Sequence, residues 1–269
     1  MHFHFTMVET LWTLTFAALL VLLVVLLGRD RVRRFPWFTV SIVLVALRML
    51  ASRLLFGKMA PIPSSEIFLT LADLAMVVSF LVAVEMARRV FARVSRNAWI
   101  AGTLVLLAIA GTVVALWGPW PAWKTVEAST TLGKLRLMQL VAQKGELLND
   151  LLYIELGVLL IVVGRRFQSG WRSHAQQIIS GLATASTAQL IVRGAWQKIA
   201  NGPPPRSQAE YLHITGLQEK LFNGNSVVYL LVLVAWIILL WRDEPGSEAA
   251  GAQRAAVAGG TPAGAVSGS

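Results

Sequence analysis

The sequence contains no cysteine and few charged residues, and each shortage excludes a class of structure. Without cysteine the chain can form neither disulfides nor thiolate metal sites, and it has no cysteine nucleophile. Charged residues make up only 14% of the 269 positions, whereas 56% are apolar. A water-soluble fold would lack the polar surface needed to cover such a core. The composition therefore predicts an integral membrane protein whose main surroundings are the lipid bilayer.

The sequence also lacks the short motifs of several enzyme classes. It has no phosphate-binding glycine-rich loop, no His-Glu-x-x-His and no Gly-x-Ser-x-Gly, which disfavours an ATPase, a zinc protease and a serine hydrolase. The few histidines have no third ligand at metal-binding spacing, so we expect neither a metal nor a cofactor. The net charge of +10 lies in short clusters between apolar runs, and no nucleic-acid partner is expected.

Seven stretches of the chain have the length and composition, or nearly so, to cross a bilayer. A hydrocarbon core about 30 Å thick needs roughly 20 apolar residues in a helix. The stretches predict an all-α fold, a polytopic bundle of seven transmembrane helices, in which the fifth and sixth stretches are the least secure. They are residues 10–27, 35–56, 67–87, 98–117, 147–163, 175–196 and 227–241.

Arginine clusters predict the orientation of this bundle. Short loops rich in Lys and Arg stay in the cytoplasm, and the connections after the first, third and fifth stretches carry such clusters. The N-terminus is therefore expected outside and the C-terminus inside. Arginine greatly outnumbers lysine, which hints at a GC-rich bacterial source and favours a bacterial inner membrane. Residues 1–242 form the predicted transmembrane domain, and residues 243–269, rich in Gly, Ala and Ser, a disordered cytoplasmic tail.

Two of the predicted outer connections are long enough to contain structure of their own. In residues 117–146, apolar positions recur at near-helical spacing over residues 132–141. In residues 200–222, three consecutive prolines precede a short amphipathic stretch at residues 211–221. We expect an amphipathic helix lying on the outer surface in the first connection and only a short amphipathic stretch in the second.

A short internal repeat relates the first three stretches to the last three. The first and fifth stretches are both followed by Gly-Arg, at Gly28 and Gly164. The second and sixth both end with an arginine, an aromatic residue three positions later and a lysine two positions after that, beginning at Arg53 and Arg193. These matches indicate a 3+1+3 plan with the fourth stretch as a linker, of the kind found in duplicated transporters. Interfacial anchoring and the arginine bias of inner loops also produce such matches.

Four ionisable residues inside the predicted helices define a polar site. A charged side chain in hydrocarbon is costly unless it is paired or hydrated. At about 1.5 Å per residue, Arg48 and Asp73 lie roughly 12 Å and 9 Å from the outer ends of their helices. Glu155 and Arg193 lie at a similar depth, which predicts two acid–base pairs. The pairs either line a ligand-binding or proton-relay cavity or serve only to fix helix register.

The sixth stretch is more polar than a lipid-facing helix permits, so we expect it at the centre of the bundle. Ser186 and Gln189 fall on the same side of the helical wheel as Arg193. The other side, which we include in the predicted site, carries Gln177, Ser180, Thr184 and Thr187. Such residues act either as ligand contacts or as hydrogen-bonding contacts between helices.

The sequence leads to a ranked set of functions without identifying a ligand. The first is a receptor-like or sensor-like protein that binds a small ligand from the outer side and acts through a membrane or cytoplasmic protein partner, because the inner loops and tail offer no effector domain. The second is a small solute or proton-coupled carrier, favoured by the repeat. The third is an intramembrane or lipid-modifying enzyme. Whether the chain is an enzyme stays open, and the sequence disfavours it.

Overall fold

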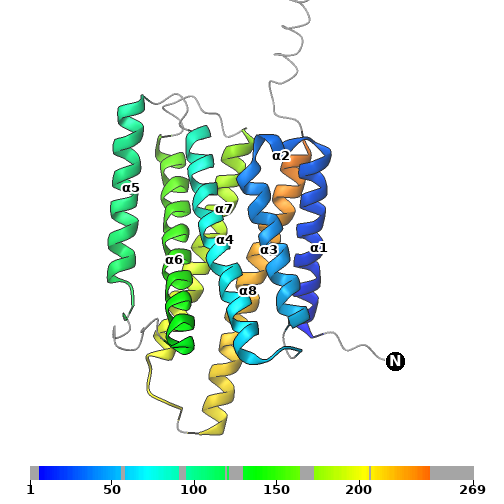
Figure 1. Cartoon of the computed structure of the whole chain (residues 1–269), viewed down its shortest axis with the longest axis vertical. Helices are drawn as coiled ribbons and strands as arrows, with labels where there is room; N and C mark the ends of the chain where they lie inside the picture. The colour runs from blue at the N-terminus through cyan, green and yellow to red at the C-terminus, as the bar shows by residue number, and fades with distance from the viewer. Residues whose placement is uncertain are drawn as a thin grey trace, which may run out of the picture.

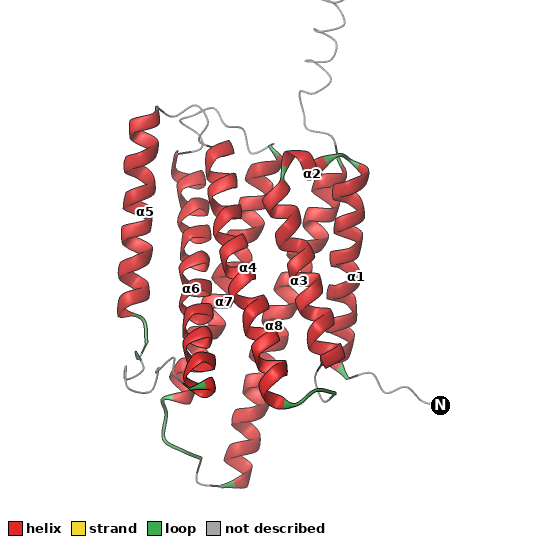
Figure 2. Cartoon of the chain, viewed as in Figure 1, coloured by secondary structure: helices red, strands yellow, loops and turns green. Residues whose placement is uncertain are grey.

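The structure, a computed structural model, consists of helices joined by loops in the part of the chain that it describes. These residues are 6–55, 58–90, 95–118, 120, 130–163, 173–205 and 207–242, so the predicted tail at 243–269 lies outside them. They contain eight helices and no strand (Figure 2), which confirms the all-α prediction. The helices are α1 (Met7–Gly28), α2 (Arg31–Arg34), α3 (Pro36–Leu55), α4 (Pro61–Val90), α5 (Arg96–Leu116), α6 (Thr131–Val163), α7 (His174–Ala200) and α8 (Gln208–Trp241).

Four of these helices, among the described residues, are long and apolar enough to cross a membrane: α1, α3, α4 and α8. α5 has a shorter apolar segment, Ile100–Leu116. α6 and α7 carry acidic, basic and amide side chains along much of their length, which lowers their hydropathy. Four helices therefore have the composition of a membrane protein, and the role of α6 and α7 depends on where their polar side chains point.

Six helices form a closed ring around the axis of the bundle. α1 packs on α3, α3 on α4, α4 on α6, α6 on α7, α7 on α8, and α8 on α1. α5 packs against the outside of α6 and stands at the edge of the molecule (Figure 1). The ring contains the predicted first three and last three stretches, and it leaves the fourth outside.

The chain enters the bundle at one end and leaves it at the other. The end of α1 meets the end of α8, where the guanidinium of Arg29 lies 4.9 Å from the ring centroid of Trp241. We call this the arginine end, because Arg31, Arg33 and Arg34 of α2 also lie there (Figure 1). The first residues of α1 and α8 lie at the opposite end, the far end, where α8 extends beyond the other helices.

The predicted separate helix on the outer surface at residues 132–141 is wrong, and both amphipathic stretches belong to longer helices. Residues 132–141 form the first turns of α6, and residues 211–221 form the first turns of α8. α8 begins at a serine cap, where the backbone N–H of Glu210 donates to the Ser207 hydroxyl at 3.2 Å. Both helices therefore continue unbroken from their amphipathic first turns into their apolar part. Hydropathy predicted only the apolar part of each.

The apolar core fills the half of the bundle next to the arginine end. Its most buried side chains come from the last turns of α1, α4 and α8 and from the first turns of α3 and α7. Phe38 and Trp236 belong to this core, and their rings meet edge to face with centroids 5.1 Å apart. Among the residues that the structure describes, the far half holds no second cluster of this size.

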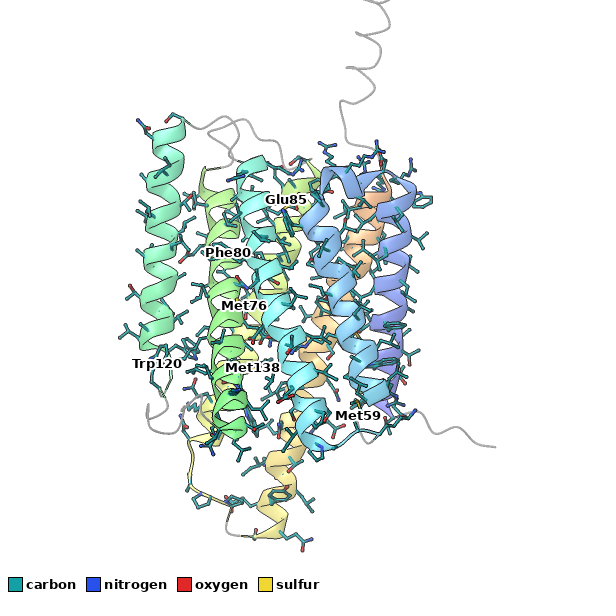
Figure 3. All side chains as sticks on the ribbon, viewed as in Figure 1. Met59, Met76, Phe80, Glu85, Trp120 and Met138 are labelled. Carbon is teal, nitrogen blue, oxygen red and sulfur yellow. The ribbon has the colours of Figure 1, made fainter. Side chains whose placement is uncertain are left out.

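Glu85 of α4 caps the first turn of α3. Its carboxylate accepts a hydrogen bond from the backbone N–H of Phe38 at 3.2 Å and pairs with Arg89 one turn later at 3.4 Å. Figure 3 shows Glu85 near the arginine end of α4. Backbone N–H groups in a first helical turn have no partner within the helix, and the helix dipole favours an anion at this position. A side chain of one helix thus fixes the start of its neighbour.

Glu85→Gln is expected to lower the free energy of unfolding by about 1–2 kcal/mol, because the amide keeps an acceptor for Phe38 but loses the charge. The measurement is an SDS titration of the detergent-solubilised protein, followed by tryptophan fluorescence. Asp30→Asn is the control, since Asp30 pairs with Arg33 at a highly exposed position and asparagine tolerates its positive φ. Equal stability of the two variants would contradict the capping role.

Candidate functional site

The far half of the bundle contains a cavity of about 700 Å³ between the six ring helices. This volume lies in the range of pockets that hold small molecules. Every ring helix contributes to the lining, and none of the lining residues belongs to α5. Its polar lining residues include Arg48, Ser79, Glu146, Asn149, Asp150, Tyr153, Ser186, Gln189, Asn225 and Tyr229.

The floor of the cavity is the edge-to-face pair of Phe38 and Trp236. Both residues line the cavity and belong to the buried core of the other half. The indole N–H of Trp236 donates to the backbone carbonyl of Gln177 on α7 at 3.2 Å, and the backbone of Phe38 is held by Glu85. The floor therefore joins α3, α4, α7 and α8. A ligand in the cavity would touch two side chains that also belong to the apolar core next to the arginine end.

Glu146 joins two arginines of different helices above this floor. One of its carboxylate oxygens accepts from Arg48 of α3 at 3.2 Å, and the other accepts from Arg193 of α7 at 3.4 Å. The three side chains are only 23–35% exposed, so solvent screens them incompletely. Arg48 also lies over the ring of Phe68, 4.9 Å from its centroid. This bridge links α3, α6 and α7 across the cavity wall.

One face of α6 supplies the polar groups below the bridge. Glu146, Asn149, Asp150 and Tyr153 follow the i, i+3, i+4, i+7 spacing of a helical stripe, and all four line the cavity. Asn149 donates to the Met76 carbonyl at 2.8 Å, and the Tyr153 hydroxyl donates to the Ser79 carbonyl at 2.7 Å.

The polar stripe of α6 therefore reaches both of its ring neighbours. On the α7 side, Asp150 accepts from the Ser186 hydroxyl at 2.8 Å. On the other side, Figure 3 shows Met76 midway along α4, next to α6. Hydrogen bonds to α4 and α7 fix the orientation of this stripe.

The predicted acid–base pairs are not the pairs that the structure contains. We expected Arg48 with Asp73 and Arg193 with Glu155, whereas both arginines bind Glu146. The depth estimate failed because α6 begins at Thr131, far before the predicted start at residue 147. Glu146 was placed in an outer loop by that estimate, although it lies in the middle of a helix.

Asp73 and Glu155 lie outside the lining of the cavity. Each has one carboxyl oxygen that is buried and makes no hydrogen bond to the described residues, Oδ1 of Asp73 and Oε2 of Glu155. Their predicted roles in ligand binding or proton relay are not tested by these contacts. Arg48 lines the cavity as expected, and Arg193 is connected to it through Glu146.

α7 turns the other side of its helical wheel to the cavity. Ser186 and Gln189 line the space, together with Leu182 and Ala185. The hydroxyls of the predicted face donate to carbonyls of their own helix: Ser180 to Gln177 at 2.9 Å, Thr184 to Ser180 at 2.8 Å and Thr187 to Ala183 at 2.7 Å. Gln177 also accepts the Trp236 bond through its backbone. Its side-chain oxygen is buried without a hydrogen bond to the described residues.

The sequence carried a signal for the residues that we missed. Glu146, Asn149 and Asp150 share one helical face, but that face becomes visible only if the helix is extended back through residues 131–146. The apolar positions at residues 132–141 already had near-helical spacing. Extending them into the next stretch would have placed all three residues in one helix.

Chemically, the cavity combines one anion shared by two cations, a second carboxylate and several neutral polar groups with aromatic walls. In the part of the chain that the structure describes, no three histidine, cysteine or acidic side chains are grouped as metal ligands. The arrangement is that of a binding site that offers both polar and apolar contacts. A comparison with protein-family models, curated proteins and solved structures gave no match.

Proposed function

We propose that the chain is a receptor-like or sensor-like integral membrane protein that binds a small ligand in the cavity and acts through a protein partner. The observation that carries this proposal is a cavity of about 700 Å³ lined by polar side chains from six helices. Buried polar groups are costly, so a protein that served only as an anchor would be more stable with this space filled by apolar side chains.

The proposal includes seven transmembrane helices, with the N-terminus outside and the C-terminus inside a bacterial inner membrane. α6 and α7 are too polar to stand alone in lipid, but they turn Glu146, Asp150 and Ser186 toward the cavity. Polar residues of membrane helices are tolerated where they face the interior of a bundle. The arginine end then faces the cytoplasm, in accord with the positive-inside rule, and the cavity lies in the outer half.

The floor of the cavity supplies the route from ligand to partner. A ligand that contacts Trp236 and Phe38 alters the packing between α8 and α3 and the hydrogen bond from Trp236 to α7. At the arginine end, Arg31 and His174 bind the carbonyl of Arg242, just after α8, at 3.4 and 3.1 Å. A small movement of α8 would therefore change contacts with α2 and α7 on the face where a cytoplasmic partner binds.

The experiment that tests this proposal is extraction of small molecules from the purified protein, followed by mass spectrometry. We expect a compound that copurifies with the wild type and falls at least fivefold in Ala75→Phe, which fills the cavity from α4. Ala108→Phe is the matched control, because Ala108 is exposed on α5, outside the ring. Identical extracts from the wild type and Ala75→Phe, both folded, would reject the cavity as a ligand site.

A small solute carrier is the second candidate, favoured by the symmetry of the ring. α1, α3 and α4 follow one another in the same circular order as α6, α7 and α8. Each triplet also has an ion pair between its first and second helix: Glu9 with Arg53 at 3.4 Å, and Glu146 with Arg193 at 3.4 Å. Arg53 and Arg193 are the residues matched in the sequence repeat. Duplicated halves of this kind are common in transporters.

Liposomes separate the two candidates. If the protein is a carrier, liposomes that contain it and are loaded with the copurifying compound should show flux of that compound across the membrane. Ala75→Phe should abolish that flux. A sensor should be stabilised by the compound and show no flux above empty vesicles. Flux would overturn the sensor in favour of the carrier.

A further inference from the structure

The donors that line the cavity are largely bonded to the protein itself. Arg48 donates to Glu146, Asn149 to the Met76 carbonyl, Tyr153 to the Ser79 carbonyl and Ser186 to Asp150. Asn225 donates to the side chain of Gln189, and Trp236 to the Gln177 carbonyl. A ligand that offers only acceptors would therefore have to share these donors or use the N–H and O–H groups that the bonds leave over.

Acceptors, in contrast, are left over on α6. Asn149 is only 4% exposed, lines the cavity and has an amide oxygen without a hydrogen bond to the described residues. A buried acceptor of this kind costs about 1–3 kcal/mol unless a partner satisfies it. Its neighbour Asp150 also lines the cavity and accepts only the Ser186 hydroxyl among the hydrogen bonds of the described residues.

Asp150 has no cationic partner within ion-pair distance among the described residues. The two nearby arginines are both bound by Glu146, and Arg193 also donates to the Gln143 carbonyl at 3.3 Å. A carboxylate in a site of low dielectric constant requires either a proton or a positive partner. A ligand with a positive charge and several N–H groups would provide the partner and also satisfy Asn149.

The remaining walls of the cavity fit the body of such a ligand. Trp12, Phe68, Tyr229 and Trp236 line it together with aliphatic side chains of α1 and α3. Aromatic faces attract cations, and the contact of Arg48 with Phe68 shows that the site already uses this interaction. Small apolar groups next to an ammonium would be buried against these rings.

We propose that the cavity binds a small primary ammonium compound with an apolar body, held by the Asp150 carboxylate and the amide oxygen of Asn149. This inference rests on the proposed function, because it names the class of ligand for the same site. The ammonium group replaces the missing cationic partner of Asp150, and its apolar body lies over the aromatic floor.

The test measures binding of three probes that share one body: phenethylammonium, phenethyl alcohol and 3-phenylpropionate. Wild-type protein in detergent should bind phenethylammonium with a Kd at least tenfold lower than that of the alcohol, and the carboxylate should bind weakest. Calorimetry gives the Kd, and thermal stabilisation of the protein provides an independent readout. This ranking requires no variant, so it decides the question even if substitutions at Asp150 prevent folding.

Asp150→Asn should raise the Kd for phenethylammonium at least tenfold and leave that for the alcohol unchanged. Glu66→Gln is the matched control, because Glu66 is exposed at the start of α4 and outside the lining. Equal or tighter binding of the alcohol or the carboxylate, or no binding of phenethylammonium, would overturn the ligand class. If a copurifying compound is still lost in Ala75→Phe, only the ligand class is rejected and the cavity remains a binding site.

Discussion

Glu146→Gln is expected to lower the free energy of unfolding by about 2–4 kcal/mol. One carboxylate pairs with two arginines of different helices, so its loss leaves Arg48 and Arg193 without their shared ion-pair partner. Removing one partner from a buried pair typically costs about 3–5 kcal/mol. We reduce this value because the three side chains are 23–35% exposed and partly screened. The measurement is the SDS midpoint of the detergent-solubilised protein.

The corresponding pair of the other triplet is the control. Glu9→Gln removes the partner of Arg53, but those side chains are 39% and 62% exposed, and exposed pairs contribute about 1 kcal/mol or less. A double-mutant cycle of Glu146→Gln with Arg193→Gln should show a coupling energy, because removing one arginine relieves part of the repulsion. If Glu146→Gln were no more destabilising than Glu9→Gln, the bridge would not hold the three helices together.

Each of the seven predicted stretches coincides with part of a helix, and four of these helices, α1, α3, α4 and α8, are long and apolar enough to cross a membrane. The first and second stretches, residues 10–27 and 35–56, agree closely with Met7–Gly28 and Pro36–Leu55. These two helices end near the limits of their apolar residues. The fifth and seventh stretches coincide with only the last part of α6 and α8, because the other turns are amphipathic and give no hydropathy signal.

The site was predicted less well, for a reason that follows from these helix boundaries. Pairing by depth needs the correct ends of both helices and the direction of each side chain. The predicted stretch began at residue 147 and so excluded Glu146. Arg193 was therefore paired with Glu155 instead. The polar face of α7 failed differently: a helical wheel separates two faces, but it does not tell which of them meets the other helices. Only the packing of the ring decides that.

Arg48 illustrates what sequence reasoning can achieve in such a chain. An arginine within an apolar stretch must find a partner, and this argument located a residue that lines the cavity. The identity of its partner was beyond reach, because Glu146 was placed in an outer loop and two other acidic residues, Asp73 and Glu155, lay at comparable depths. The sequence thus predicts which helices contribute charged side chains to the interior. The packing of the ring helices determines which of these side chains form ion pairs.

Gly181→Ala is expected to lower the free energy of unfolding by about 2–4 kcal/mol, more than typical overpacking, which costs about 1–3 kcal/mol. An added Cβ would lie 2.6 Å from Cε2 of Trp236 and 2.8 Å from its Cζ2. Trp236 is only 2% exposed and packs against Phe38, so its ring cannot move aside without disturbing the cavity floor. The shift would also weaken the hydrogen bond from the indole to Gln177, which lies one turn before Gly181.

Gly224→Ala is the matched control for this prediction. Gly224 lies in α8, the same helix as Trp236, and an added Cβ meets nothing within 4 Å. Alanine is the better helix former, so this variant should be as stable as the wild type or more stable by about 0.5–1 kcal/mol. Thermal unfolding in detergent measures both variants.

A double variant locates the clash. Trp236→Leu removes the ring that Gly181→Ala would strike, so the two substitutions together should cost less than the sum of their separate effects. Small residues at helix contacts allow close approach of helices in membranes, and this pair fixes the distance between α7 and α8 beneath the cavity. Additive costs for the two substitutions would place the effect of Gly181→Ala elsewhere than at the indole, and the floor would not depend on that close approach.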